Sequence, residues 1–343
     1  MVKVLVLATS KKSTGGITGV LKLYEQSEMW NKYHCFWIGT HRYGSKLVKF
    51  WYAIKGMAQF IIMLPFYDIV HVHVSAPSSA KRKYLFFKLA KKYKKKVVLH
   101  LHLGTQINQV WSPMYQTMFE QCDCGIVLSD NLKTKVEEHI GKSDKIKVVY
   151  NPCPIVPNTT LYEKKNHVLF SGHIIPDKGY KDLIRAFAII ARKYSEWKLV
   201  FAGNREIEQA RALADELGIS EQVVLLGWVS GERKHKAYSE ARALCLPSYA
   251  EGFPMAVLEA WSYGLPVIAT PVGGIPDIAV DGENMLLFNP GNIDALANKL
   301  ELIISDKALR DKMSAESLLL AKGKFSLESI TNQVEEIYER VLK

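Results

Sequence analysis

Short apolar runs alternate with longer, helix-like stretches through the first 150 residues of the chain. The runs that predict buried strands cover residues 2–8, 34–40, 68–74, 96–103, 125–129 and 145–150. Such alternation is typical of βαβ units, in which a helix connects two parallel strands. The pattern therefore predicts a parallel sheet with helices on its faces.

A proline-rich segment then interrupts the alternation. Residues 151–157 contain three prolines, which continue neither a helix nor a central strand. Apolar runs at 167–172, 197–203, 222–229 and 243–247 begin a second set of strands. Because 343 residues exceed one ordinary hydrophobic core, we expect an α/β protein with two Rossmann-like domains, 1–155 and 156–326.

The longest helix-like stretch, residues 46–67, is rich in aromatic side chains and approaches the length of a membrane span. Lys49, Lys55 and Gln59 interrupt it, which argues against a crossing. Two interpretations remain: a helix packed on the sheet, or a helix lying in the interface of a membrane.

Positive charge is concentrated in the first half of the chain. Residues 1–160 contain 23 Lys and Arg against 9 Asp and Glu, and the remainder carries a net charge of −3. Much of the excess lies in a helical pattern at 81–96, with Leu85, Phe86, Leu89 and Ala90 expected to face inward. A basic amphipathic helix suits an anionic membrane surface or a phosphorylated lipid, although an ordinary solvated helix face has the same composition. No recognised nucleic-acid-binding motif accompanies the charge, so no nucleic acid is expected.

The cysteine and histidine patterns predict no metal. Five cysteines at irregular positions indicate neither a disulfide framework nor a four-cysteine zinc site, and Met1 leads straight into a strand, without an evident signal peptide. We therefore expect a reduced, cytosolic protein. His71 and His73 alternate on one strand, but the sequence offers no evident third ligand, so a structural role is expected.

The most informative stretch is 248–277. The apolar run 243–247 predicts a buried strand, and the turn after it leads into a helix that starts at about Pro254. The helix N-terminus, with Gly252, Phe253, Pro254 and Met255, would then face the carboxyl edge of the sheet and attract a phosphate or sugar oxygen. Glu251 and Glu259 flank this edge and could accept hydrogen bonds from sugar and ribose hydroxyls.

This stretch resembles the donor site of retaining GT-B glycosyltransferases, in particular glycosyltransferase family 4. The resemblance rests on Glu251 and Glu259 with seven residues between them, and it continues through 264–269, 273–277 and 281–284. It implies two Rossmann-like domains that face a cleft, with a nucleotide-diphosphate sugar, such as a UDP-sugar, on the second domain and the acceptor on the first. It also implies that the C-terminal helix, 327–343, crosses back to the first domain.

The resemblance also implies roles for catalytic residues. Glu251 would hold a sugar hydroxyl and Glu259 the ribose hydroxyls, while Lys178 and His173 would hold the diphosphate. The family usually has Arg in place of His173, and His lacks the permanent charge and the fork of donors, so the diphosphate contact is expected to be weaker or pH-sensitive. His102 would contact the transferred sugar, with His100 as the alternative.

Further substrate contacts are implied in three loops. Gly15 and Gly16 follow the first strand and would approach the donor phosphates and the acceptor, unless they form only a turn. Gly203 and Asn204 resemble a nucleotide-contacting loop. Val229 would border the base, on which Trp228 would either stack or else pack in the core. No Gly-x-Gly-x-x-Gly follows the first strand, which argues against NAD.

The resemblance thus implies a metal-independent, retaining enzyme of the hexosyltransferase type (EC 2.4) that needs no cofactor, and with the basic first domain it favours a role in polysaccharide or glycolipid biosynthesis. The acceptor would be a lipid-linked sugar or another glycan, and the protein would be cytoplasmic, with possible peripheral binding at the inner face of the membrane. The absence of Asp-x-Asp agrees with metal independence. The alternatives are a non-catalytic nucleotide-sugar-binding partner of a polysaccharide assembly complex, and a nucleotide-sugar epimerase or phosphorolytic enzyme on the same fold.

Overall fold

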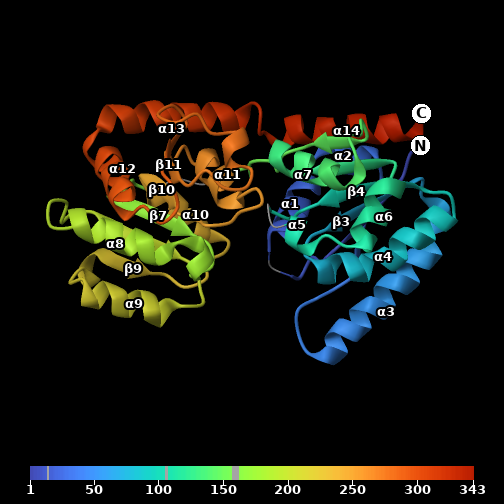
Figure 1. Cartoon of the computed structure of the whole chain (residues 1–343), viewed down its shortest axis with the longest axis horizontal. Helices are drawn as coiled ribbons and strands as arrows, with labels where there is room; N and C mark the ends of the chain where they lie inside the picture. Colours follow the sequence, from blue (N-terminus) through green and yellow to red (C-terminus); the bar gives the residue numbers. More distant parts are fainter. Residues whose placement is uncertain (14, 105–106, 157–161) are drawn as a thin grey trace. The chain divides into compact units, whose positions relative to one another are not determined.

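The computed structural model describes residues 1–13, 15–104, 107–156 and 162–343. The chain divides into two compact units (Figure 1). Unit 1 consists of Met1–Pro152 together with Leu327–Lys343, and unit 2 consists of Cys153–Ser326.

Within the described residues, unit 1 contains a six-stranded parallel sheet with the strand order β2-β1-β3-β4-β5-β6. The strands are β1 (Val4–Ala8), β2 (Phe36–Gly39), β3 (Ile69–Val74), β4 (Lys96–Leu101), β5 (Cys124–Val127) and β6 (Ile146–Val148). Every residue of β3 is buried, as expected for a parallel strand that is covered on both faces. The carboxyl ends of all these strands meet at one edge of the sheet.

Helices cover both faces of this sheet (Figure 1). They are α1 (Gly16–Tyr24), α2 (Glu28–Lys32), α3 (Lys46–Met63), α4 (Pro77–Lys92), α5 (Ile107–Val110), α6 (Pro113–Gln121), α7 (Asp130–Ile140) and α14 (Leu327–Leu342). The last of them, α14, comes from the far end of the chain and buries Ile330, Val334 and Tyr338 in unit 1. The ring of Tyr338 packs edge-on against Tyr33, which follows α2.

Unit 2 contains a second six-stranded parallel sheet, again counted over the residues that the structure describes, with the order β12-β11-β10-β7-β8-β9. Its strands are β7 (His167–Ser171), β8 (Lys198–Ala202), β9 (Val223–Leu225), β10 (Ala243–Leu246), β11 (Val267–Ala269) and β12 (Met285–Leu287). Its helices are α8 (Tyr180–Ile190), α9 (Ile207–Glu216), α10 (Glu232–Glu240), α11 (Met255–Ser262), α12 (Ile293–Ser305) and α13 (Lys307–Lys322). The predicted α/β class with two Rossmann-like sheets is confirmed.

Some predicted elements are shorter than expected. The strand predicted at 222–229 covers only Val223–Leu225, because Gly227 adopts a left-handed backbone with a φ of 69° and ends it. The strand predicted at 96–103 ends at Leu101, so His102 lies just beyond the carboxyl end of β4.

The inward face of α4 differs from the prediction. Its buried stripe runs through Ser79, Lys83, Phe86 and Ala90, at the spacing of one helix face. Leu85 lies outside this stripe and is exposed, whereas Lys83 lies within it and is fully buried. The prediction followed the apolar residues, but the helix is rotated so that a lysine takes one of the inward positions.

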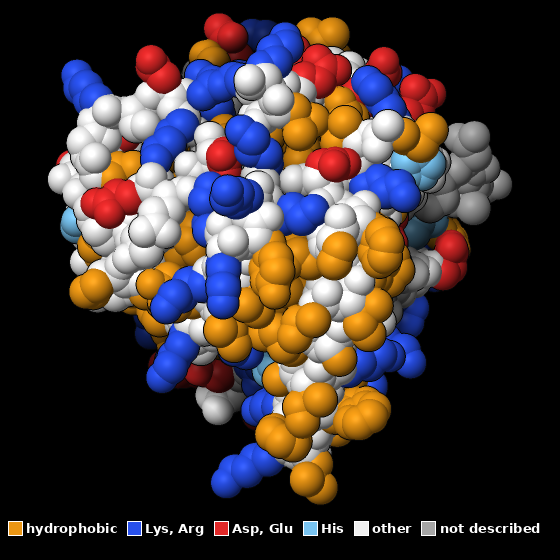
Figure 2. Space-filling view, turned by 90° about the vertical axis from the view of Figure 1, so that its right-hand side faces the viewer, with side chains coloured by type: hydrophobic (Ala, Val, Ile, Leu, Met, Phe, Trp, Pro, Cys, Tyr) orange, Lys and Arg blue, Asp and Glu red, His pale blue; other side chains and the backbone are white. Residues whose placement is uncertain are grey.

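Helix α3 is exposed over most of its length. Within the helix only Gly56 and Phe60 are buried. We call the large exposed apolar side chains on and beside it the α3 patch: Leu47, Phe50, Trp51, Ile54, Ile61, Ile62 and Phe66. Figure 2 shows hydrophobic side chains gathered on this side of the molecule, with Lys and Arg side chains beside them. The 21 residues Lys46–Phe66 are long and apolar enough to cross a membrane by length and composition, with 17% of their most apolar window buried, but one such helix is weak evidence for a crossing.

Candidate functional site

Lys178 and Glu251 form an ion pair at the carboxyl edge of the sheet of unit 2. Lys178 ends a short 3-10 turn after β7, and Glu251 lies in the turn after β10, the neighbouring strand. The ammonium of Lys178 donates to Oε1 of Glu251 at 2.5 Å, and the hydroxyl of Ser248 donates to the same oxygen at 2.7 Å. The other carboxylate oxygen, Oε2, has no partner among the described residues. The pair therefore leaves one oxygen of Glu251 for a ligand hydroxyl.

Glycines allow the backbone to hold this pair in place. A Cβ on Gly179, which has a φ of 66°, would lie 2.0 Å from the carbonyl oxygen of Pro247. A Cβ on Gly273, with a φ of 64°, would lie 2.4 Å from the carbonyl oxygen of Glu251. Only glycine fits both the conformation and the space at these two positions. These two glycines therefore allow the loops that carry Lys178 and Glu251 to pack closely against neighbouring backbone.

Helix α11 begins beside this pair. Its N-cap, Pro254, makes no side-chain hydrogen bond, and its first turn contains no acidic residue. Gly274 donates its backbone N–H to the carbonyl of Gly252 at 2.7 Å, which fixes the approach to the helix. Phe253 is buried, so it supports the turn rather than presenting its ring to a ligand. The uncapped helix N-terminus provides positive potential for an anionic group, as expected for a phosphate site.

Glu259 lies on α11 and is held by α10. Lys234 donates to its Oε1 at 2.5 Å, and Tyr238 donates to its Oε2 at 2.7 Å. Burial, followed by the charge of Glu259, raises the pKa of Tyr238 well above its usual value, so the phenol remains a donor. Each carboxylate oxygen retains a further acceptor site. The sequence prediction missed Lys234 and Tyr238, because no local pattern links α10 to a helix about 20 residues later.

His173 follows β7 and is held by two neighbours. Its Nδ1 lies 2.7 Å from Oδ1 of Asn204, and its ring stacks on Trp228 with the centroids 5.5 Å apart. Because an amide oxygen only accepts, Nδ1 carries the proton, and the second nitrogen, Nε2, is a donor only in the imidazolium form. Trp228 is 44% exposed, so the alternative of a packed core residue is wrong.

The neighbouring loop brings β7 and β8 into close contact. A Cβ on Gly203 would lie 1.8 Å from the carbonyl oxygen of Gly172, and the backbone of Ile174 donates to the carbonyl of Asn204 at 2.8 Å. Gly203 thus allows Asn204 to reach His173. Val229 is buried, which leaves its backbone rather than its side chain to contact a ligand.

The predicted residues of unit 1 lie at the carboxyl edge of its own sheet. Gly15 precedes α1 with a φ of 132°, and a Cβ on either Gly15 or Gly16 would meet no atom of the described residues within 4 Å. This space is open to a ligand. His100 is fully buried, whereas His102 is partly exposed, so the structure favours His102 over the alternative.

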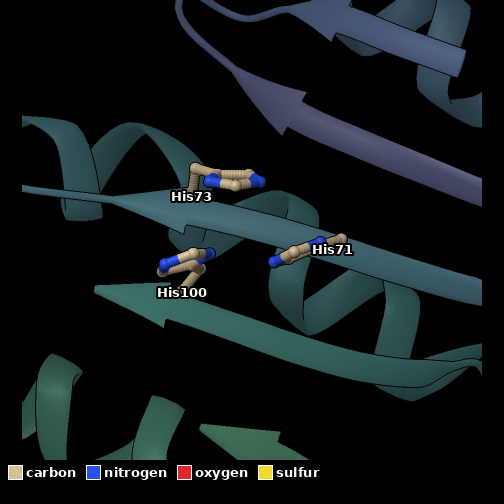
Figure 3. A group of neighbouring side chains, drawn as sticks. All are labelled: His71, His73 and His100. Carbon is tan, nitrogen blue, oxygen red and sulfur yellow. The ribbon is translucent and has the colours of Figure 1, made fainter. Parts of the chain in front are cut away.

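His102 belongs to a stack of four histidines, three of which are shown in Figure 3. The Nδ1 of His73 lies 2.8 Å from Nε2 of His102, and the Nδ1 of His71 lies 2.7 Å from the hydroxyl of Tyr338. Burial lowers the pKa of His71 and of His102 to about 3, and lowers the pKa of His73 and His100 well below the usual value. The four imidazoles are therefore neutral at physiological pH.

The sequence shows no third ligand beside His71 and His73, but the structure places His100 next to them. His100 on β4 pairs in register with His73, and one nitrogen from each of His71, His73 and His100 lies within 4.8 Å of the others. The rings of His71 and His100 are nearly parallel, however, with an interplanar angle of 8°. Nearly parallel, stacked rings pack face to face, as aromatic rings commonly do in a protein core. The arrangement fits a structural stack better than a metal centre.

The comparisons with known proteins identify the chain's family. Residues 155–318 match the family model for glycosyl transferases group 1, and residues 31–155 match that for glycosyltransferase family 4. The relatives include the capsular polysaccharide biosynthesis glycosyltransferase CapM of Staphylococcus aureus, 30% identical over 64% of this chain and 62% of CapM. They also include the lipopolysaccharide 1,6-galactosyltransferase of Salmonella typhimurium, 33% identical over 53% of each protein. The aligned part spans about three fifths of the length of the first curated relatives.

Solved structures agree over the whole chain. Anabaena HepE in complex with UDP-glucose has a TM-score of 0.79 with 18% identity, over 99% of this chain and 100% of HepE. The apo form of the lipopolysaccharide outer core galactosyltransferase WaaB has a TM-score of 0.70 with 23% identity, over 98% of this chain and 99% of WaaB. At these identities the likeness concerns the fold. The two family models together place the chain in glycosyltransferase family 4, and the solved structures show its GT-B fold.

Proposed function

We propose that the protein is a retaining glycosyltransferase that moves a hexosyl group from a nucleotide-diphosphate sugar to a glycan or lipid-linked acceptor. The observation that carries this proposal is the arrangement of two Lys–Glu pairs beside the N-terminus of α11. Lys178–Glu251 and Lys234–Glu259 offer carboxylates for hydroxyl groups and ammonium groups for phosphates at one sheet edge. This combination suits a ligand that carries a sugar, a diphosphate and a ribose.

The donor would bind to unit 2 as follows. Lys178, the imidazolium form of His173 and the N-terminus of α11 would hold the diphosphate. Oε2 of Glu251 would accept from a sugar hydroxyl, and Glu259 would accept from the ribose. Gly203, Asn204 and the backbone of Val229 would border the nucleotide. The presence of UDP-glucose in the complex of HepE supports a UDP-sugar as the first donor to test.

In the reaction, the bond between the anomeric carbon and the diphosphate breaks, and a bond to the acceptor oxygen forms. The negative charge that develops on the leaving diphosphate would be stabilised by Lys178 and the helix N-terminus. The acceptor proton would pass to an oxygen of the leaving phosphate. These cations supply the electrostatic stabilisation that a divalent ion supplies elsewhere, so we propose a reaction without metal and without a further cofactor.

The acceptor and the site of action are proposed from unit 1 and from the relatives. The α3 patch and the lysines of α4 suit binding to an anionic membrane surface. One relative from Campylobacter jejuni is named as an N-acetylgalactosaminyltransferase acting on a glycan linked to undecaprenol diphosphate. The surface of unit 1 and the named relative both agree with a cytoplasmic enzyme that binds peripherally to the inner face of the membrane. Such an enzyme would act in polysaccharide or glycolipid synthesis.

Nucleotide binding tests the donor site directly. Thermal unfolding would be followed without metal in the presence of UDP, GDP, ADP or dTDP, because a ligand that binds only the folded state raises the melting temperature. We expect one nucleotide to stabilise the wild-type protein and to lose this effect in Glu259→Gln. Glu208→Gln, which changes an exposed glutamate on α9, is the matched control. Stabilisation that persists in Glu259→Gln would contradict the ribose role.

Product analysis separates transfer from the rival functions. A transferase releases the nucleoside diphosphate only as a new glycosidic bond forms on the acceptor. An epimerase would change the nucleotide sugar without an acceptor, and a non-catalytic binding protein would produce neither result. Detection of an acceptor-dependent glycoside, with its anomeric configuration assigned by NMR, would also test retention.

A further inference from the structure

Positive charge gathers at the carboxyl edge of the sheet of unit 1, close enough to the histidine stack for Lys83 to lower the pKa of His73 and His102. His41 follows β2, while Arg82 and Lys83 lie on α4, which follows β3. The pKa of His41 is lowered by burial and then by the charges of Arg82, Lys49 and Lys83. Three cationic side chains from two helices therefore lie around one buried ring.

Lys83 is the most unusual member of this cluster. Its side chain is fully buried, and its ammonium donates one hydrogen bond, to the hydroxyl of Ser79 at 2.9 Å. An ammonium has three donors, and no other partner for it occurs among the described residues. Burying a charged group without an opposite charge is costly. An anionic ligand bound near Lys83 would supply the missing opposite charge and lower this cost.

The location of the ammonium adds to this cost. Ser79 lies in the first turn of α4, so the charge of Lys83 lies beside the N-terminus of that helix. A helix N-terminus carries partial positive charge, which favours anions and disfavours cations. Ala76 provides no side-chain cap, and the first turn contains no acidic residue. The helix N-terminus and the ammonium of Lys83 thus place two positive charges close together.

Arg82 completes the arrangement. Its Nε is buried and has no hydrogen-bond partner in the described part of the chain. Within the same described residues, no ion pair joins Arg82, Lys83 or Lys49 to a carboxylate. In unit 2, by contrast, Lys178 and Lys234 each pair with a glutamate. Other lysines of unit 1, such as Lys91 with Asp123, also have such partners, so Arg82, Lys83 and Lys49 stand apart from these among the described cations.

We propose that Arg82, Lys83 and the N-terminus of α4 form a binding site for a phosphate or diphosphate group of the acceptor. The proposal rests on the proposed function, in which unit 1 binds the acceptor. Arg82 is partly exposed and has the planar fork that binds phosphate oxygens in pairs, while Lys83 adds charge from within the unit. The acceptor class is thereby narrowed to molecules that carry a phosphate, such as an isoprenoid diphosphate sugar.

Pyrophosphate binding tests the site without the donor. Calorimetric titrations would use the full chain with Lys178→Met, which removes the proposed phosphate contact of unit 2. We expect Arg82→Gln and Lys83→Met in this background to weaken pyrophosphate binding about tenfold or more, since the first removes a charge-assisted contact and the second removes a buried positive charge. Lys88→Met, an exposed lysine on the same helix, is the matched control and should bind pyrophosphate normally. Equal affinity in Arg82→Gln and Lys88→Met would overturn the proposal.

Two further measurements show whether the bound phosphate belongs to an acceptor or to a phospholipid headgroup. They also show whether each variant is folded. A short isoprenoid diphosphate should follow the pyrophosphate result, whereas binding to phosphatidylglycerol vesicles should be unchanged in Arg82→Gln. If vesicle binding falls and isoprenoid diphosphate binding does not, the cluster recognises phospholipid headgroups and the acceptor proposal is wrong. UDP binding, measured with Lys178 intact, should persist in Arg82→Gln. Failure of UDP to bind the wild-type protein would instead contradict the donor site, and melting curves establish that each variant is folded.

Discussion

For Glu251 and His173, the hydrogen bonds in the structure determine which atom is left to bind a ligand. Glu251 accepts from Lys178 and Ser248 on one oxygen and keeps the other unoccupied by any described residue. His173 uses one nitrogen to hold Asn204 and has one nitrogen left. Each therefore offers a single atom to a ligand, and a single substitution can test each role.

Replacing Glu251 by Gln keeps the size of the side chain and removes its charge. We expect kcat to fall by about tenfold to a hundredfold, because a hydrogen bond to a charged group contributes about 1.5–3 kcal/mol. UDP affinity should change little, because Glu251 is assigned to the sugar. Steady-state kinetics together with UDP titrations would check this, with Glu208→Gln as the control. An equal loss of UDP affinity would place Glu251 at the nucleotide instead.

The tautomer of His173 predicts a pH dependence. Nδ1 donates to Asn204, so Nε2 donates to a phosphate only when the ring is protonated. We expect kcat/KM for the donor to decline as the pH rises past neutrality. His173→Arg, which is permanently charged, should flatten this decline. The same decline in both proteins would assign it to another group.

Lys83 predicts that stability rises with pH. Burial, followed by the charge of Arg82, lowers the pKa of Lys83 from 10.5 to about 7. Between these values the unfolded chain binds more protons than the folded chain, so the free energy of unfolding increases as the pH rises from about 7 towards 10. The neighbouring His41, His73 and His102, whose pKa values are all lowered, stay neutral over this range.

Lys83→Met should abolish this rise and stabilise the protein at pH 6. The gain should be at most a few kcal/mol, since one pKa unit corresponds to about 1.4 kcal/mol. Urea unfolding at pH 6 and pH 9 would measure both effects. Lys88→Met should behave like the wild type, and a wild-type protein whose stability does not rise with pH would show that Lys83 is not buried in its charged form.

At the scale of single elements, periodicity located the helices better than it oriented them. The stretch 81–96 was predicted as a helix, yet its apolar residues suggested Leu85 rather than Lys83 on the inner face. The rotation of α4 is set by the residues that pack against it. The hydrogen bond from Lys83 to Ser79, one turn earlier, cannot be predicted from the composition of the helix. Likewise, Lys178 and Glu251 were both predicted as site residues, but they are 73 residues apart and pair only because β7 lies next to β10.

The exposed apolar side chains of α3 predict that this helix binds to membranes. The double variant Phe50→Glu with Trp51→Glu replaces two exposed apolar side chains of the α3 patch with acidic ones. We expect it to lose most binding to phosphatidylglycerol vesicles in a sedimentation assay, since it removes apolar area and adds charge of the wrong sign. Leu319→Glu, an exposed site on α13 of unit 2, should bind as the wild type does. Undiminished binding by the double variant would mean that α3 does not contact the membrane.

At the scale of the whole molecule, sequence and structure agree on two parallel sheets and on where the basic charge lies. Alternation of strands and helices is a local property, and each βαβ unit repeats it, so the fold class could be predicted from one sequence. The histidine stack could not. His71, His73, His100 and His102 meet only because β3 and β4 are neighbours in register, and Tyr338 reaches them from more than 230 residues away.

The position of α14 has a consequence for the order of synthesis. The chain enters unit 2 after Pro152 and returns to unit 1 at Leu327, so unit 2 is inserted into the sequence of unit 1. During translation, unit 2 is complete before unit 1, whose first 152 residues must wait for the helix that buries His71 against Tyr338. Until α14 emerges from the ribosome, part of the core of unit 1 is uncovered. The nascent chain therefore passes through a stage at which protection by a chaperone would be most valuable.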